Sequence, residues 1–325
     1  MNAHALFGAF LGLLSLVAFN HPAQSQTWPQ RPVKIVVPFA PGGNTDGIAR
    51  IVAARLGDAF GQSFIVENRQ GAGGALAAEA VARSPADGYT FFLTPVTIMA
   101  ILPALTKTPF DPVKDFAPIS NIGTNPNVLA ASPNLPIKTL ADFVEHVRAR
   151  PGKLSYAAGT VGSLSHLSMA LFVKRAGLDM VAVTYKGGGP APVTDTIAGH
   201  VATYFAPLSD VLAHKESGAL RLLAVSSESR VAQVPDVPTV SESGFPGFMT
   251  QSWNGLLAPA GTPKEIIARI AQELGRAVKD PAFVERLVAY GVNPLCNGPD
   301  EFAAMIAADI AFWAQAIKIA GVQEK

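Results

Sequence analysis

Short runs of β-branched and aromatic residues alternate with amphipathic stretches of helical spacing along most of this chain. This alternation restricts the possible folds more than any other feature of the sequence. The run 33–39 (VKIVVPF) has the composition of a buried strand. Beyond the turn that follows it, apolar residues recur at helical spacing at Ile48, Ile51, Val52, Leu56, Ala59 and Phe60. Strands that alternate with helices form a mostly parallel sheet covered by helices, so the sequence predicts an α/β fold.

The same alternation continues to the end of the chain. We expect further strands at residues 64–66, 89–93, 154–157, 180–184, 201–205, 220–225 and 253–258. We expect further helices at residues 75–83, 139–150, 164–176, 190–199, 208–218, 263–279, 281–291 and 299–320. A mature chain of roughly 300 residues exceeds the comfortable size of one hydrophobic core, which favours two lobes.

The N-terminal segment has the character of an export signal. Residues 6–19 are almost entirely apolar, and polar and small residues follow at positions 21–26. The apolar run is shorter than the roughly 20 residues that a membrane-spanning helix needs. We therefore predict a signal peptide at residues 1–25, cleaved after Ser25, and a soluble mature protein. The alternative is a buried N-terminal helix, which Pro22 and the polar residues after it disfavour.

The composition argues against several kinds of site. Cys296 is the only cysteine, so no intramolecular disulfide is possible and a lone thiol supports no metal cluster. The chain has 25 basic and 24 acidic residues, and the basic ones are scattered without aromatic interleaving. Such a distribution gives no support to a nucleic-acid partner. We expect no metal, no cofactor and no nucleic acid.

Two glycine-rich turns stand between a strand and a helix, at residues 39–46 (FAPGGNTD) and 157–163 (AAGTVGS). Glycine lets backbone approach a ligand closely, and the helix that follows offers free N–H groups and about half a positive charge. A carboxylate suits both turns. If they belong to different lobes, a small acid between them is held by both helix starts. The alternative is that both are ordinary turns that need glycine only for their geometry.

Seven further motifs carry a resemblance to a known family. They are WPQRPVKIVVPFAPGG (28–43), VENRQGAGG (66–74), DGYT (87–90), PVKDFAP (112–118), YKGGGP (185–190), PDVPTV (235–240) and LLAPAGTP (256–263). In their order and spacing they resemble the tripartite tricarboxylate transporter receptors, also called Bug receptors, over essentially the whole mature chain.

The resemblance implies a periplasmic binding protein-like fold with two lobes, each a mixed, mostly parallel sheet flanked by helices, and a ligand cleft between them. Lobe I is expected at residues 26–124 plus 226–325 and lobe II at residues 125–225, with two chain crossings as the hinge. The resemblance also implies a periplasmic solute-binding protein without enzymatic activity. Such a receptor captures a small organic acid and delivers it to membrane transporter subunits, and we expect a monomer.

The site residues implied by the resemblance come from both turns. Lobe I is expected to offer Phe39, Ala40, Gly42, Gly43, Asp46, Thr94 and Thr97. Lobe II is expected to offer Gly159, Thr160, Gly162, Ser163, Lys186, Gly187 and Gly188. Two departures from the family pattern stand out, Ala206-Pro207 in place of a polar Asp-Asn pair and an apolar loop after Leu93. Both suggest a ligand less polar than a dicarboxylic amino acid.

Several of these residues have a second interpretation. Asp46 is favoured in a first helical turn by the helix dipole alone. Ser163 and His166 have the residue types of a nucleophile and its base, so an exported hydrolase is the competing function, although no third group is evident. The Lys186 side chain either faces an anion or only keeps an ordinary turn in contact with solvent. A receptor that signals to a periplasmic sensor, instead of feeding transport, would have the same fold.

Overall fold

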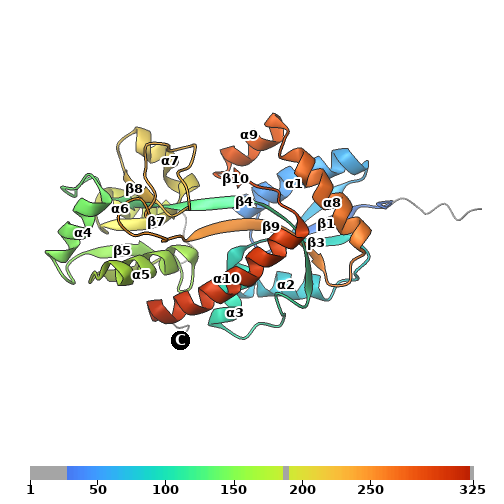
Figure 1. The fold of residues 1–325 in the computed structure, drawn as a ribbon, viewed down its shortest axis with the longest axis horizontal. Coiled ribbons are helices and arrows are strands. Elements are labelled where there is room, and N and C mark those ends of the chain that lie inside the picture. Colours follow the sequence, from blue (N-terminus) through green and yellow to red (C-terminus); the bar gives the residue numbers. More distant parts are fainter. Residues whose placement is uncertain (1–27, 186–189, 323–325) are drawn as a thin grey trace, which may run out of the picture.

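One sheet runs through the length of the molecule (Figure 1). The computed structural model describes residues 28–185 and 190–322, and within these residues ten strands form the sheet. The main path of the sheet is β2-β1-β3-β9-β4-β7-β5-β6, while β8 and β10 both pair with β4. The predicted signal peptide and the segment 186–189 lie outside the described residues. The predicted α/β fold is confirmed.

The first part of the sheet is built from the N-terminal strand–helix units. The strands β1 (Val33–Val37), β2 (Phe64–Asn68) and β3 (Thr90–Pro95) are parallel, and β9 (Gln251–Pro259) joins β3 antiparallel. The helices α1 (Asn44–Phe60) and α2 (Ala75–Ala82) connect the parallel strands, with the 3-10 turn η1 (Ala72–Gly74) before α2. A π-helical turn, η2 (Thr97–Ile101), and the short α3 (Leu102–Leu105) follow β3.

The second part repeats this construction. The strands β5 (Ser155–Ala158), β6 (Val181–Thr184) and β7 (Thr203–Pro207) are parallel, with β5 between the other two. The helices of this part are α4 (Leu140–Arg148), α5 (Leu164–Ala176), α6 (Pro190–Ala198) and α7 (Leu208–Glu216), and β8 (Arg221–Val225) follows α7. Parallel strands place their carboxyl ends at one edge, so α5 and α7 begin side by side.

A long strand that was not predicted joins the two parts. β4 (Phe116–Ala131) pairs with β9 through its residues 116–126 and with β7 and β8 through its residues 127–131. Pro118 and Pro126 interrupt its sequence, and the register with β9 shifts near Pro118 and Asn121. Prolines argue against a strand when the sequence is considered alone. The irregular register accommodates them here.

The C-terminal helices return across the first part. α8 (Lys264–Ala277), α9 (Pro281–Ala289) and the short β10 (Asn293–Pro294) precede α10 (Pro299–Ala320). α10 runs diagonally from the first part toward α5 in the second (Figure 1). It is long and apolar enough to cross a membrane, but it packs Phe302, Ile306 and Trp313 into the hydrophobic core. One face of α10 therefore packs on the core of this fold.

Separate clusters of buried apolar side chains hold the two parts. Around α1 and α8 the core contains Ile35, Ile48, Phe91, Leu256 and Ile270. Around α2 and α10 it contains Phe92, Trp253, Phe302 and Trp313, together with Leu164 and Leu167 from α5. In the second part the two faces of the sheet bury Phe143, Phe172 and Phe205 on one side and Val128, Tyr204 and Val211 on the other. The sheet is thus covered on both faces.

The chain crosses between the two parts at two places, and Ser226 links them. Its backbone N–H and its hydroxyl both donate to the carbonyl of Asn127 in β4, over 2.8 and 3.1 Å. The hydroxyl also lies 2.6 Å from the carbonyl of Thr250, whose N–H donates to Ser226 in return. Ser226 is fully buried. These bonds join the two chain crossings to each other.

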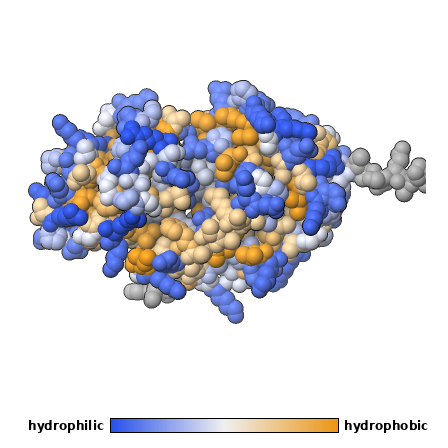
Figure 2. Space-filling model, viewed as in Figure 1, coloured by the Kyte–Doolittle hydropathy of each residue, from blue (hydrophilic) through white to orange (hydrophobic). Residues whose placement is uncertain are grey.

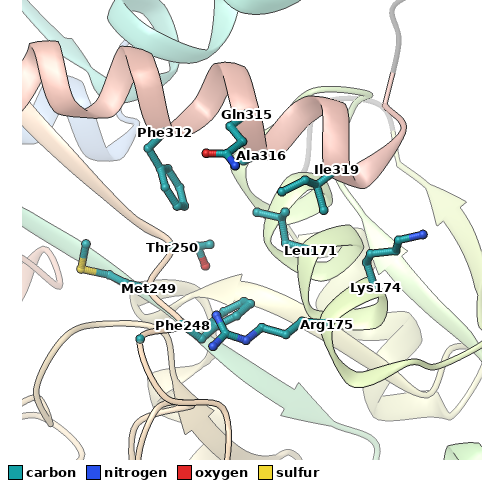
Figure 3. A pocket seen from close by; sticks show the side chains of 11 residues that line it. Leu171, Lys174, Arg175, Phe248, Met249, Thr250, Phe312, Gln315, Ala316 and Ile319 are labelled. Atoms are coloured by element: carbon teal, nitrogen blue, oxygen red, sulfur yellow. The ribbon is translucent and has the colours of Figure 1, made fainter.

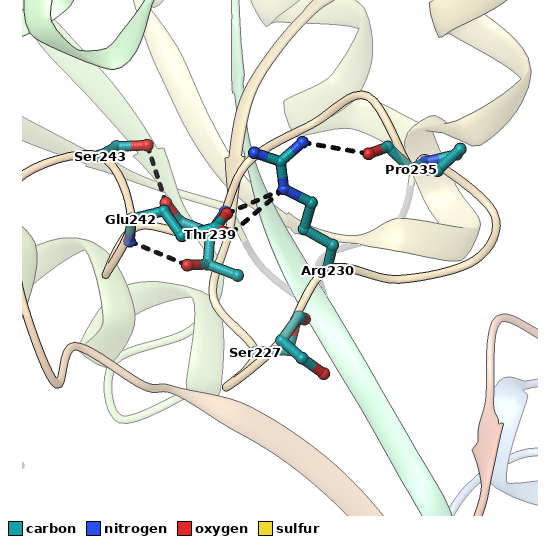
Figure 4. Close-up of polar contacts among 7 residues, drawn as sticks. Ser227, Arg230, Pro235, Thr239, Glu242 and Ser243 are labelled. Carbon is teal, nitrogen blue, oxygen red and sulfur yellow. Dashed lines mark hydrogen bonds and ion pairs between the residues drawn. The ribbon is translucent and has the colours of Figure 1, made fainter.

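The loop between β8 and β9 is held by its own polar contacts (Figure 4). Thr239 and Glu242 cap each other, because the Glu242 N–H donates to the Thr239 hydroxyl and the Thr239 N–H donates to the Glu242 carboxylate. Arg230 binds the same carboxylate at 3.0 Å and the carbonyl of Pro235 at 3.3 Å. These contacts stiffen the loop that leads to the second crossing.

We expect Gly255→Ala to lower the free energy of unfolding by about 1–3 kcal/mol, as overpacking of a core does. A Cβ atom at Gly255 in β9 would lie 2.0 Å from the ring of Phe302, which is fully buried. Gly275→Ala in α8 is the matched control, because a Cβ there meets nothing within 4 Å. It should raise stability by up to about 1 kcal/mol through helix propensity. Urea unfolding of both variants measures the difference, and equal stabilities would contradict this packing.

Candidate functional site

The turn from β1 to α1 presents exposed backbone. Residues 39–43 are all solvent-exposed, and Gly42 has a φ of +86°, which glycine adopts without strain. Gly43 is the N-cap of α1, and no side chain caps the first N–H groups of this helix. A helix start without a side-chain cap keeps its partial positive charge and its donors available.

The Asp46 carboxylate holds this turn in shape. It accepts hydrogen bonds from the Gly42 N–H, from the Arg50 guanidinium and from the Asn68 amide, all at 2.9–3.0 Å, and Asp46 is 3% exposed. Burial alone raises the pKa of this carboxyl, but the hydrogen bonds from Arg50, Gly42 and Asn68 outweigh it and keep the pKa below its usual value. With its oxygens occupied, Asp46 positions the turn.

The second turn, between β5 and α5, is held by hydrogen bonds of its own. The Gly159 N–H donates to the Ser165 hydroxyl at 3.1 Å, and the Gly162 N–H donates to Nδ1 of His166 at 3.3 Å. Ser163 is the N-cap of α5, and its hydroxyl accepts from the His166 N–H. Gly162 has a φ of +80°. The backbone of this turn is therefore fixed before any ligand arrives.

Ser163 and His166 do not form the hydrogen bond that a nucleophile and its base require. The His166 ring accepts from a backbone N–H, and the Ser163 hydroxyl contacts the Ser165 hydroxyl at 3.2 Å. Burial lowers the pKa of His166, so the ring is neutral near pH 7. In the described residues this pair acts as a helix cap.

The second turn lies where the two parts of the molecule meet. A Cβ atom at Gly162 would lie 2.3 Å from the side chain of Leu105 in α3. Leu164 and Leu167, in the first turns of α5, pack into the core beneath α10 and η2. The start of α5 thus lies against the first part of the molecule, which also carries the start of α1.

The other residues expected at the site differ in their exposure to solvent. Thr94 is fully buried near the end of β3, and its hydroxyl makes no hydrogen bond in the described structure. Thr97 is partly buried in η2, and Thr160 is exposed. Phe39 and Ala40 are exposed beside Gly42. Lys186, Gly187 and Gly188 lie outside the described residues, and their predicted role stays a prediction.

The comparisons with known proteins agree on one family. Residues 48–322 match the family described as "Tripartite tricarboxylate transporter family receptor". This chain belongs to that family. The protein BugT of Bordetella pertussis is 36% identical to this receptor over 326 residues, which cover 99% of this chain and 98% of BugT.

Two solved structures show the same fold at similar identity. "R. palustris Rpa4515 with adipate" has a TM-score of 0.80 and 36% identity, covering 91% of this chain and 99% of that chain. "MatC (Rpa3494) from Rhodopseudomonas palustris with bound malate" has a TM-score of 0.74 and 32% identity, covering 89% and 99%. The periplasmic binding protein-like, two-lobed fold of the receptor is thereby confirmed.

A third helix start borders the same junction in this receptor, and the sequence did not reveal it. β7 continues directly into α7, with Pro207 as the N-cap, so Ala206 is buried and no loop separates strand from helix. The exposed polar residues of this start are Ser209 and Asp210, in the first turn of α7. Ala206 and Pro207 stand where an Asp-Asn pair was expected and offer no polar side chain. The polar side chains of this region come instead from the first turn of α7.

An apolar pocket of about 360 Å³ lies elsewhere in the receptor, between α5 and α10 (Figure 3). Phe312 and Ile319 of α10 and Leu171 of α5 line it, together with Met249 and Thr250 of the second crossing. Figure 2 shows apolar surface along α10. No residue of the two turns lines this pocket, so it is separate from the helix starts. The described part of the chain also holds no cluster of metal-ligating side chains.

Proposed function

We propose that this receptor binds a small organic carboxylate at the junction of its lobes and delivers it to the membrane subunits of a tripartite tricarboxylate-type transporter. The observation that carries the proposal is the uncapped start of α1 together with the glycine turn before α5, where Gly162 lies against Leu105 of the other part. Neither turn contains an Arg, so backbone N–H groups are the donors for the anion. Because both lobes contact the same ligand, ligand binding favours the arrangement in which the lobes are closed.

The relatives support a carboxylate. Rpa4515 is described with adipate and MatC with bound malate, and both of these molecules are carboxylates. In this chain each turn also carries an exposed apolar side chain, Phe39 at 37% and Val161 at 48% exposure. These side chains suit the hydrocarbon part of an acid whose carboxylate rests on the helix starts.

The finer points of this proposal follow from family membership and from the sequence. We infer export to the periplasm by the signal peptide at residues 1–25, lobes divided at residues 124–125 and 225–226, action as a monomer and no catalytic activity. The second division is better drawn near residue 250, because Val231, Val234 and Phe248 pack with side chains of the second part. Growth on the bound acid that is lost when the membrane subunits are deleted would distinguish transport from signalling.

A thermal melt with a panel of organic acids tests the proposal. A ligand at a hundred times its dissociation constant should stabilise the protein by roughly 2.7 kcal/mol. The methyl ester or primary amide of the same acid should shift the melt far less, because the helix starts favour a negative charge. If acid and ester stabilise equally, or if no acid binds, the proposed anion site is wrong.

A further inference from the structure

The start of α7 lies beside the start of α5 and faces the first part of the molecule. β5 and β7 are neighbouring parallel strands, so the helices that follow them begin at the same edge of the sheet. A Cβ atom at Gly291 would lie 3.2 Å from the Cβ of Ser209 in the first turn of α7. Gly291 belongs to the loop after α9, in the first part of the molecule. The first turn of α7 is therefore at the lobe junction.

The same loop also touches the start of α1. The Asn44 amide donates to the carbonyl of Tyr290 at 2.7 Å, and the Tyr290 ring occupies the space where a Cβ of Gly47 would lie. Residues 290–291 thus contact the first turn of α1 on one side and the first turn of α7 on the other. The starts of α1 and α7 therefore lie on opposite sides of one short loop.

Asp210 is the charged group of the α7 start. Its side chain contacts solvent, and yet burial raises the pKa of its carboxyl. Desolvation by the surrounding protein favours the neutral form of a carboxyl even where one side of it contacts solvent. The described residues place no basic side chain within ion-pair distance of Asp210, and only the Ser209 hydroxyl donates to it, at 3.2 Å.

Tyr204 is buried in β7, the strand that leads into α7. Burial, together with the nearby charge of Asp210, raises the pKa of Tyr204 to about 12, while a hydrogen bond with Ser165 opposes the rise. Ser165 in turn accepts the N–H of Gly159. Because α5 and α7 begin at the same edge of the sheet, Asp210 in the first turn of α7 lies on the same side of the sheet as the glycine turn before α5, and its carboxylate has unused acceptor capacity.

We propose that Asp210 is a specificity-determining residue of the receptor and accepts a hydrogen bond from an ammonium or hydroxyl group of the ligand. This inference rests on the proposed function, because the ligand carboxylate is assigned to the helix starts of α1 and α5. The ligand class is then an amino- or hydroxy-substituted carboxylic acid. A second carboxylate at this position would meet the like charge of Asp210 and is disfavoured.

The other acidic group of the site does not compete for this role. Asp46 already accepts from Gly42, Arg50 and Asn68, so a ligand donor would have to displace a hydrogen bond within the protein. Asp210 has one such partner, an exposed hydroxyl on the preceding residue. A ligand donor can therefore reach Asp210 without breaking the turn.

The test compares Asp210→Asn with the wild type by calorimetry. The probes are unsubstituted, hydroxy- and amino-substituted monocarboxylic acids of three to six carbons, and dicarboxylic acids of the same lengths. Asp210→Asn should weaken binding of the amino and hydroxy acids about ten- to a hundredfold, as loss of a charge-assisted hydrogen bond does, and leave the unsubstituted acids unchanged. Dicarboxylates should bind the variant more tightly than the wild type.

Asp300→Asn is the matched control, because Asp300 is also an exposed aspartate in the first turn of a helix, α10. It should leave every affinity unchanged. Asp210→Glu keeps the charge and should retain the preference for amino and hydroxy acids. If Asp210→Asn affects all acids equally, or none, Asp210 has no role in specificity although acids still bind. If no acid binds the wild type, the proposed function itself fails and the role of Asp210 fails with it.

Discussion

Asp46→Ala should lower the free energy of unfolding by about 3 kcal/mol, the lower end of what removing one partner of a buried ion pair costs. We take the lower end because the Arg50 side chain is 54% exposed and its freed charge regains water. The variant removes the acceptor of the Gly42 N–H and one of the two acceptors of the Asn68 amide, which also donates to the Phe39 carbonyl. Since these groups fix the turn before α1, ligand affinity should fall by at least about a hundredfold.

The pH dependence of stability provides the second readout for Asp46. Its pKa in the folded protein lies below the usual 3.8, so its contribution is fully present above that value and is lost as the pH falls through the folded pKa. The wild type should therefore lose more stability than Asp46→Asn as the pH is lowered below about 4. Identical acid unfolding of the wild type and Asp46→Asn would show that the carboxylate does not hold the turn.

Regular elements with a clear period were predictable from the sequence. The helices at 164–176 and 299–320 were predicted with the bounds that α5 and α10 have. Apolar periodicity identifies both helices, and a glycine follows the last residue of each. The parallel strands β1, β3 and β5 were placed to within two residues. In these segments local propensity and burial favour the same structure.

β4 could not be predicted, because tertiary pairing determines it. Pro118, Asn121 and Pro126 are residues that strands usually avoid, yet neighbours on both sides fix the backbone of this segment. The same limit applies to the site. Both glycine turns were found, because glycine and a helix start are local signals. The proximity of Leu105 to Gly162, and of α7 to α1, depends on chain crossings that no local pattern shows.

Gly162→Val should abolish ligand binding, with affinity reduced by more than about a hundredfold, equivalent to about 2.8 kcal/mol. Valine is strained at the φ of +80°, and its Cβ would lie 2.3 Å from Leu105. Relief of that contact moves the turn away from the first lobe. The displaced start of α5 then no longer holds an anion together with the start of α1. Calorimetry with any acid that stabilises the wild type measures the loss.

Gly177→Val is the control that separates the loss of ligand binding in Gly162→Val from the effect of backbone strain alone. Gly177 ends the same helix, α5, with a φ of +61°, and a Cβ there meets nothing within 4 Å. Both variants should lose about 1–3 kcal/mol of stability through the left-handed backbone, and both should still unfold cooperatively. Only Gly162→Val should lose binding, because only its side chain points at the opposite lobe. If Gly162→Val binds acids as the wild type does, the glycine turn is not the anion site, and the ligand carboxylate must be held by other groups.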